Sequence, residues 1–206
     1  MQTKSGVIVV LSGPSGSGKS SLMKRVEDKL DNYYISISTT TRPARNQEIN
    51  GEDYLFISKE EFLKDIRDNC FLEHAVVHGN YYGTSIRPVQ TALQEGRLVL
   101  FDIDVQGHAA IRDKFPDIIT SIFITTPSLA ELKHRLSGRA TETNEIMQER
   151  LNIAKKELLH IKEYDYVLVN DDFEQTVNAL LDIIQAAKLK KPAAEIDDFV
   201  SKWLQN

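Results

Sequence analysis

The sequence is poor in features that mark exported or membrane proteins. Its single cysteine, Cys70, excludes an intramolecular disulfide and suits a reducing cytoplasm. No apolar stretch approaches the roughly 20 residues that a membrane-spanning helix needs. The residues before the first apolar run do not resemble a signal peptide. We therefore expect a cytoplasmic protein that does not interact with membranes.

Positive charge is also scarce. Lysines and arginines number 25 against 30 aspartates and glutamates, so the formal net charge is −5. This balance argues against a broad surface for nucleic acid, although a few clustered arginines would suffice for a small anion. The 206 residues contain no internal repeat, and their number fits one α/β domain with an insertion.

Apolar runs of strand length alternate with helical patterns along much of the chain. The runs, all expected to be buried strands, cover residues 7–11, 98–104, 121–125 and 166–170. Helices are expected from Lys19, over 145–161 and over 173–189. This alternation predicts an α/β fold, a parallel sheet with helices on both faces.

Residues 36–88 break this rhythm, because they are polar and rich in turn residues, arginine, tyrosine and glutamate. We expect them to form a small α+β lobe inserted after the second strand. The core would then comprise residues 1–35 and 89–190, with a short helical lid at about 137–150.

The last residues, 191–206, are expected to form a separate amphipathic helix. Five apolar residues follow the linker-like stretch KLKKP at the spacing of one helical face. We favour docking of this face on its own domain, with packing against a second subunit as the alternative. The protein is thus expected to be a monomer or a homodimer.

A glycine-rich loop, GPSGSGKS, lies between the first strand and the helix that follows it. It matches the pattern G-x-x-x-x-G-K-[ST], in which backbone N–H groups and a helix N-terminus face phosphates. Lys19 would reach the β- and γ-phosphates and Ser20 would bind Mg²⁺; a glycine turn without a ligand is the alternative. The expected ATP contacts here are Gly13, Pro14, Ser15, Gly16, Ser17, Gly18, Lys19, Ser20 and Ser21.

Two acidic residues, Asp102 and Asp104, end a buried apolar run. Ionised groups at that edge need a cation or hydrogen-bond donors to offset their desolvation. Asp102 could hold Mg²⁺ together with Ser20. The alternative is that one of the two aspartates caps the helix expected from Val105.

A phosphate clamp is expected in the inserted lobe. Arg42 and Arg45 lie three residues apart, and Tyr54 follows. Two guanidinium groups and a phenol can hold one dianionic phosphate; the alternative is a pair of surface arginines in a loop.

These residues belong to the stretch TTRPARNQEINGEDYLF, which resembles the signature of guanylate kinases, enzymes that transfer phosphate from ATP to GMP. The resemblance extends from about Val7 to Leu189. It includes the motifs FLEHA (71–75), GNYYGTS (79–85), DIDVQG (102–107), RLSGRATET (135–143) and VNDD (169–172).

The resemblance implies a P-loop NTPase-type core, ATP with Mg²⁺ and GMP as substrates, and a role for each matching residue. Residues implied to hold the GMP phosphate are Arg42, Arg45, Tyr54 and Tyr82, and Glu48 belongs to the same signature. Glu73 would read guanine, while Ser38, Thr84 and Asp104 would also face the base. Asn170 would lie near the adenine of ATP.

The chemistry of guanine supports Glu73 independently of the family. Guanine presents two adjacent donors, N1–H and the 2-amino group, and one carboxylate accepts both. Adenine would leave that carboxylate unpaired, and a site built on such bonds can reject the wrong partner by about 10⁴-fold.

Three arginines surround the expected lid: Arg135, Arg139 and Arg150. Phosphoryl transfer requires neutralisation of charge on the moving group, which arginines on a lid can supply. We expect Lys19, Arg42, Arg139 and Arg150 to be catalytic. Arg135 is an expected ATP contact, although it could instead pair with Glu131 four residues earlier. The other two could be solvated arginines on helix faces.

Other functions remain as alternatives. A kinase for another phosphorylated acceptor, such as a sugar phosphate, would use the same loop. A non-catalytic scaffold would not need the complete phosphate loop and the lid arginines. A GTPase switch normally requires an N-K-x-D motif, which the sequence lacks.

Overall fold

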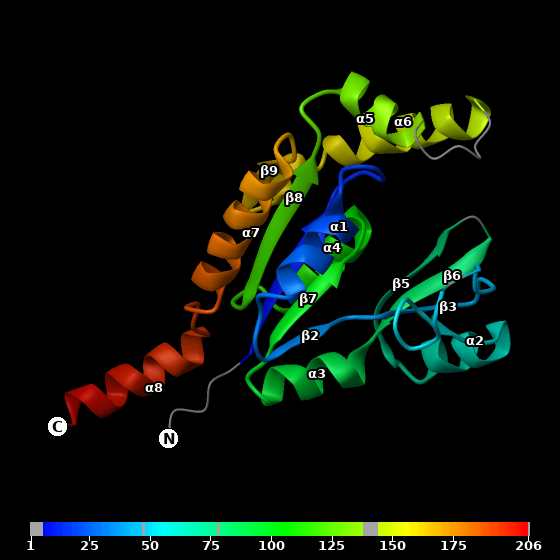
Figure 1. Ribbon diagram of the computed structural model, residues 1–206. Helices are drawn as coiled ribbons and strands as arrows, with labels where there is room; N and C mark the ends of the chain where they lie inside the picture. The colour runs from blue at the N-terminus through cyan, green and yellow to red at the C-terminus, as the bar shows by residue number, and fades with distance from the viewer. Residues whose placement is uncertain (1–5, 47, 78, 138–143, 206) are drawn as a thin grey trace.

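A five-stranded parallel sheet forms the centre of the computed structural model (Figure 1), which describes residues 6–46, 48–77, 79–137 and 144–205. In spatial order its strands are β2 (Tyr33–Ile35), β7 (Leu98–Asp102), β1 (Val7–Ser12), β8 (Ile119–Thr125) and β9 (Tyr166–Val169). All four neighbouring pairs are parallel. The predicted α/β class is confirmed.

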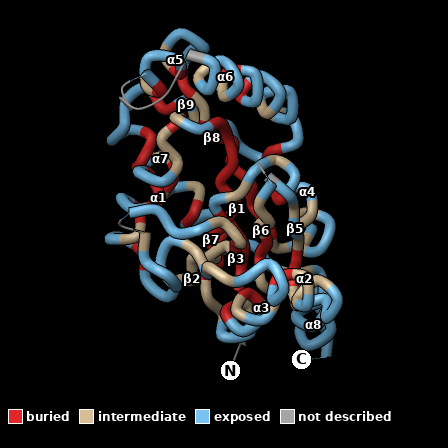
Figure 2. The backbone as a smooth tube through the Cα atoms, turned by 90° about the vertical axis from the view of Figure 1, so that its right-hand side faces the viewer, coloured by how far each residue is buried: buried red, intermediate tan, exposed pale blue. Residues whose placement is uncertain are grey.

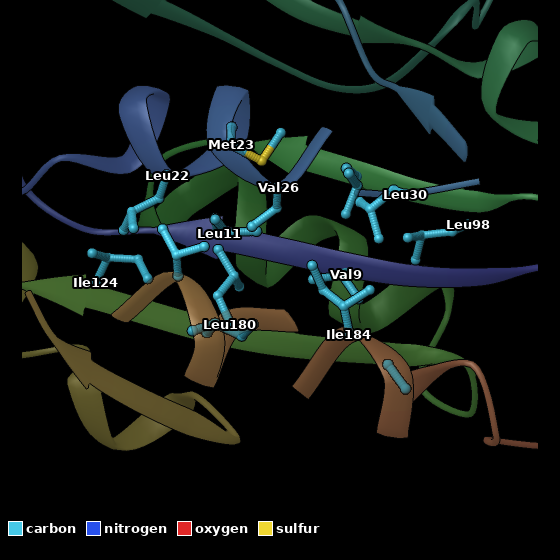
Figure 3. Packing of buried hydrophobic residues seen from close by; sticks show 14 of the residues in the cluster. Val9, Leu11, Leu22, Met23, Val26, Leu30, Leu98, Ile124, Leu180 and Ile184 are labelled. Atoms are coloured by element: carbon cyan, nitrogen blue, oxygen red, sulfur yellow. The ribbon is translucent and has the colours of Figure 1, made fainter. Parts of the chain in front are cut away.

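One face of this sheet is covered by α1 (Lys19–Glu27) and α7 (Phe173–Ala187). Val9 and Leu11 of β1 point toward these helices, and Figure 3 shows them packed against apolar side chains of both. Burying each such side chain contributes about 1.5–3 kcal/mol. Strand β1 is therefore held in place by apolar contacts directly before the glycine loop.

The opposite face is covered by α3 (Ile86–Gln94) and α4 (Val105–Lys114). Ile8 and Val10 of β1 point to this side, where they join buried residues of both helices. Because successive side chains of a strand face opposite sides, the uninterrupted apolar run VIVVL fits a strand that is covered twice.

Strand β9 departs from the expectation of a buried strand at 166–170. It lies at the edge of the sheet, and Tyr166, Val167 and Val169 are 44%, 45% and 50% exposed. An apolar run shows that a segment can pair as a strand. It does not show whether a further element covers the outer side.

A second sheet forms the lobe between β2 and α3. Its strands, in spatial order, are β4 (Leu55–Phe56), β3 (Ser38–Thr40), β6 (Asn80–Ser85) and β5 (Phe71–Val77). Helix α2 (Lys59–Arg67) begins with the predicted capping box, in which Ser58 and Glu61 bind each other's backbone N–H groups. Phe62 of this helix is fully buried and stacks on Phe71 of β5.

Two helices lie above the carboxyl ends of the core strands: α5 (Leu129–Ser137) and α6 (Asn144–Leu158). Leu132 and Leu136 of α5 pack against Leu151 and Ala154 of α6. Their outer surfaces are exposed along most of their length (Figure 2). Part of the expected lid, residues 138–143, lies outside the described residues. A short 3-10 helix, Ile161–Glu163, connects α6 to β9.

The C-terminal helix α8 (Ala193–Leu204) does not dock on the domain, so the favoured expectation for residues 191–206 was wrong. None of its described residues is buried, and the helix extends away from the sheet (Figure 1). Lys190 anchors the preceding turn by donating to the Ile119 carbonyl at 2.5 Å. Within the part of the chain that the structure describes, no helix is long and apolar enough to cross a membrane.

Removal of α8 is therefore expected to leave the stability of the domain unchanged. A chain ending at Pro192 should melt within about 2 °C of the full chain. As a control, Leu180→Ala opens a cavity in the buried cluster around β1 and should lower the midpoint by about 5–10 °C. Differential scanning calorimetry compares the three proteins. A large loss on truncation would show that α8 stabilises the fold.

Candidate functional site

The glycine loop runs from the end of β1 to the start of α1, at the carboxyl edge of the sheet. Gly13 and Gly18 have φ values of 137° and 98°, which favour glycine. A Cβ atom at Gly13 would lie 2.0 Å from the Ile124 carbonyl oxygen, and one at Gly18 would lie 2.3 Å from the amide nitrogen of Asn170. These approaches explain why the loop requires glycine at both ends.

A cavity of ≈ 920 Å³ lies over this loop. Lys19 lines it, and its ammonium donates to the Gly13 carbonyl at 2.6 Å. The remaining lining residues come from the loop, the ends of β7 and β9, the lobe and helices α5, α6 and α7: Gly13, Ser15, Gly16, Gly18, Ser20, Ser21, Tyr54, Asp102, Ile103, Asp104, Arg135, Glu157, Asn170 and Phe173. The glycine loop, the start of α1 and a cation thus line a space that can accept phosphates.

The hydroxyl of Ser20 and the carboxylate of Asp102 lie together, with 3.4 Å between Ser20 Oγ and Asp102 Oδ2. Although Asp102 is open to the cleft, the protein atoms that crowd it raise the pKa of its carboxyl. The charge of Lys19 and the Ser20 hydroxyl act in the opposite direction. Two adjacent hard oxygen donors on an open cleft fit a Mg²⁺ ion that keeps part of its water shell.

Asp104 has a different position, which matches the capping alternative. Its side chain is the N-cap of α4, where Oδ1 accepts from the N–H groups of Gln106 and Gly107 at 3.0 and 2.8 Å. The residue still lines the cavity, so capping fixes its carboxylate at the wall of the cleft.

Asn170 holds the glycine loop through its side chain. Its buried side-chain amide donates to the Ser17 carbonyl at 2.8 Å, and the backbone carbonyl of Asn170 accepts from Arg135 at 2.9 Å. Arg135 also binds Glu131 at 2.7 Å, as the alternative for this arginine supposed. The side-chain amide of Asn170 is therefore engaged with the protein backbone of the phosphate loop.

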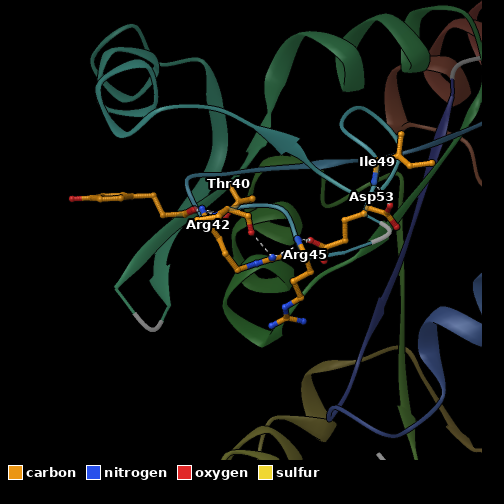
Figure 4. A network of polar contacts seen from close by, with 8 residues as sticks. Thr40, Arg42, Arg45, Ile49 and Asp53 are labelled. Atoms are coloured by element: carbon orange, nitrogen blue, oxygen red, sulfur yellow. Dashed lines mark hydrogen bonds and ion pairs between the residues drawn. The ribbon is translucent and has the colours of Figure 1, made fainter. Parts of the chain in front are cut away.

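In the inserted lobe Arg42 forms a double ion pair with Glu48. Its two terminal nitrogens donate to the two carboxylate oxygens at 2.9 and 2.8 Å (Figure 4). The guanidinium group lies 5.3 Å from the ring centre of Tyr54. Hydrogen bonds from Arg42 and from the Arg45 backbone lower the pKa of Glu48. Glu48 therefore orients Arg42, whereas the Arg45 side chain is exposed.

A second, smaller cavity of ≈ 230 Å³ contains the expected base reader. Glu73 lines it, and the Thr84 hydroxyl donates to Glu73 Oε1 at 2.6 Å. Thr84 is opposite both Glu73 and Ser38 in the strand register. Burial raises the pKa of Glu73, the Thr84 hydroxyl opposes this, and the charge of Asp104 raises the pKa further. The full lining is Ser38, Tyr54, Glu73, Ala75, Tyr82, Asp102, Ile103, Asp104 and Gly107.

The two cavities share a wall formed by Tyr54, Asp102, Ile103 and Asp104. Ligands in the two spaces would therefore approach each other at the carboxyl end of β7. Such an arrangement can bring two phosphorylated molecules together for group transfer.

The lid arginines are placed only in part. Arg139 lies outside the described residues. Arg150 is half-buried on α6 and is not among the described residues that line either cavity. The same helix contributes Glu157 to the larger cavity.

The guanylate kinase family model matches residues 5–187. The chain belongs to the guanylate kinase family. It is 53% identical over 203 residues to the guanylate kinase of Sulfurimonas denitrificans, and the aligned region covers 98% of each chain. It is also 49% identical to that of Wolinella succinogenes, with 98% of this chain and 94% of the relative covered.

The fold supports the same assignment. The crystal structure of guanylate kinase from Anaplasma phagocytophilum has a TM-score of 0.73 and 35% identity, over 91% of this chain and 89% of that one. The guanylate kinase described here is thus a nucleoside monophosphate kinase, an ATP:GMP phosphotransferase. The resemblance stated from the motifs is confirmed.

Three features of this guanylate kinase site could not be read from its motifs. Glu48 pairs with Arg42, Asn170 holds the loop, and Glu157 reaches the cavity from α6. The position of Glu157 could have been predicted from one feature of the sequence. It lies seven residues, about two helical turns, after Arg150, and therefore on the same side of the helix. The partners of Glu48 and Asn170 depend on how loops fold back on strands.

Replacement of Asn170 by alanine is expected to loosen the phosphate loop. The change removes the donor to Ser17 and should cost about 1–3 kcal/mol of unfolding free energy. The KM for ATP should rise about fivefold or more, while the KM for GMP changes little. Urea unfolding and steady-state kinetics measure both effects, with Asn152→Ala on the exposed side of α6 as control. Unchanged stability and an unchanged KM for ATP would show that the glycine loop keeps its conformation without the Asn170 side chain.

Neutralisation of Glu48 should affect the GMP side alone. In Glu48→Gln, Arg42 loses the carboxylate that accepts two charge-assisted hydrogen bonds from it, and its guanidinium group is no longer oriented. Since charge-assisted bonds are about twice as strong as neutral ones, we expect the KM for GMP to rise about fivefold and the KM for ATP to stay constant. Glu52→Gln, an exposed residue of the same loop, is the matched control. A lower KM for GMP would mean that Glu48 repels the substrate.

Proposed function

We propose that each cavity of this guanylate kinase holds one nucleotide and that the γ-phosphoryl group of ATP crosses their shared wall to the GMP phosphate. The observation that carries this proposal is the common lining of the two spaces by Tyr54, Asp102, Ile103 and Asp104. The GMP phosphate oxygen is already a nucleophile at neutral pH, so positioning can supply most of the rate.

The larger cavity would hold ATP with its phosphates on the glycine loop. In this arrangement Lys19 leaves the Gly13 carbonyl and pairs with the β- and γ-phosphates. Ser20 and Asp102 would hold Mg²⁺, which reduces the negative charge on the phosphates when it is bound. Asn170 would act on ATP through the loop.

The smaller cavity would hold GMP. Its phosphate would meet Tyr54, Tyr82 and the guanidinium groups of Arg42 and Arg45. The carboxylate of Glu73 would accept both donors of guanine. Ser38, Thr84 and Asp104 would surround the base, and Thr84 already fixes one oxygen of Glu73.

Charge on the moving phosphoryl group would be neutralised by arginines from the lid region. We assign this task to Arg139 and Arg150. Arg135 lines the larger cavity, is bound to Glu131 and to the Asn170 backbone carbonyl, and would contact ATP. Closure of the lobe and the lid would exclude water from the transfer site. We further propose a cytoplasmic enzyme, in keeping with a single thiol and with substrates of nucleotide metabolism.

A panel of phosphate acceptors tests this function. ADP release is measured with ATP and Mg²⁺ and with GMP, dGMP, AMP, CMP, UMP or a sugar phosphate. We expect fast turnover with GMP and almost none with AMP. Silence with every nucleotide despite measurable GMP binding would favour a scaffold, and activity with the sugar phosphate alone would refute the assignment of the base pocket.

The role of Glu73 has its own test. Glu73→Gln keeps the shape but loses one acceptor, so the KM for GMP should rise by about 10²-fold or more while ATP affinity stays constant. Equal losses for both nucleotides would contradict the role of Glu73 in base recognition.

The pH dependence gives a second readout for the same residue. Guanine requires the ionised carboxylate, and the raised pKa of Glu73 means that this form is lost at a higher pH than for an ordinary glutamate. Between about pH 7 and about pH 5 the KM for GMP should rise in the wild type. The Gln variant should show a smaller rise, which comes from protonation of the GMP phosphate (pKa about 6) and not from Glu73.

A further inference from the structure

Helix α6 places a carboxylate in the phosphate cavity to which the function above gives no task. Glu157 lies in the last turn of α6 and is half-buried. It lines the ≈ 920 Å³ cavity together with Lys19 and Asp104. An acidic group at a site for polyanionic phosphates opposes binding, so its presence needs another explanation.

Lys19 is a cation in the same cavity as Glu157. Burial is the main cause that raises the pKa of its carboxyl, and Asp104 raises it further. Lys19 is the neighbouring charge that favours the ionised form. The Lys19 ammonium lies on the Gly13 carbonyl at 2.6 Å, at the wall of the cavity that Glu157 also lines.

The geometry of α6 connects this pair to the transfer site. Arg150, Ala154 and Glu157 have the spacing 0, 4 and 7, which places them along one side of a helix. Ala154 is buried against α5, where it packs with Leu132 and Leu136. Arg150 and Glu157 belong to one rigid helix, so whatever positions Glu157 over the phosphate loop also positions Arg150.

We propose that Glu157 is a positioning residue for phosphoryl transfer: its attraction for Lys19 across the cleft aligns α6, and with it Arg150, on the phosphate loop. This inference rests on the proposed use of Lys19 and Arg150 in transfer. The same carboxylate repels bound phosphates. Glu157 thus weakens nucleotide binding and favours turnover, a combination that a residue with a purely structural role would not show.

The variant Glu157→Gln separates these effects because it keeps the shape and removes the charge. We expect kcat to fall about tenfold, with the KM for GMP changed less than about threefold. A non-hydrolysable ATP analogue with Mg²⁺ should bind about threefold or more tightly by calorimetry, since one repulsive charge is gone. Glu157→Asp, which keeps the charge, should recover part of kcat. Glu149→Gln, on the exposed side of the same helix, should match the wild type.

A double-mutant cycle on the nucleotide-free protein tests the partner directly. Urea midpoints are measured for Glu157→Gln, Lys19→Met and the double variant. Coupling between the side chains predicts that Glu157→Gln lowers the midpoint less when Lys19 is already replaced. Additive changes in the midpoint would overturn the pairing.

The kinetic outcomes distinguish this inference from the function itself. A wild type active with GMP and a Glu157→Gln variant with unchanged kcat and affinity would overturn the inference alone. A parallel loss of kcat, nucleotide affinity and melting temperature would assign Glu157 a structural role. A wild type that lacks GMP kinase activity would instead refute the function on which the inference rests.

Discussion

The close approach of the glycine loop to its surroundings is the constraint on which the site depends. Gly13 passes the Ile124 carbonyl of β8 and Gly18 passes the Asn170 amide at distances that leave no room for a side chain. Asn170 in turn holds the loop through the Ser17 carbonyl. The loop can therefore present its N–H groups only if β1, β8 and the end of β9 are already packed together.

The two sheets position the residues of the site in different ways. In the parallel sheet all strands end at the same edge, so Ser20 and Asp102, 82 positions apart in the sequence, come within hydrogen-bond range. In the inserted lobe the strand register matters, because Ser38 and Glu73 each lie opposite Thr84. A register shift of one residue would turn these side chains to the other face of the sheet.

Charged groups of the site are engaged with other groups of the protein. Arg42 is bound to Glu48, and Lys19 is bound to the Gly13 carbonyl. These contacts limit the desolvation cost of the charges and hold the side chains close to their expected ligands. In the proposed function nucleotides replace some of these contacts, which would link affinity to the strength of the internal pairs.

Much of the fold and the composition of the site followed from the sequence, because those features depend on local pattern: the β1 run, the glycine loop, the Ser58 cap and the spaced motifs of the family. Tertiary structure alone decided which elements are covered, leaving β9 at an edge and α8 undocked. It also decided the partners of Glu48 and Asn170 and placed Glu157 at the cavity. Such features depend on contacts between segments far apart in the chain or folded back on themselves, which periodicity and residue type do not encode.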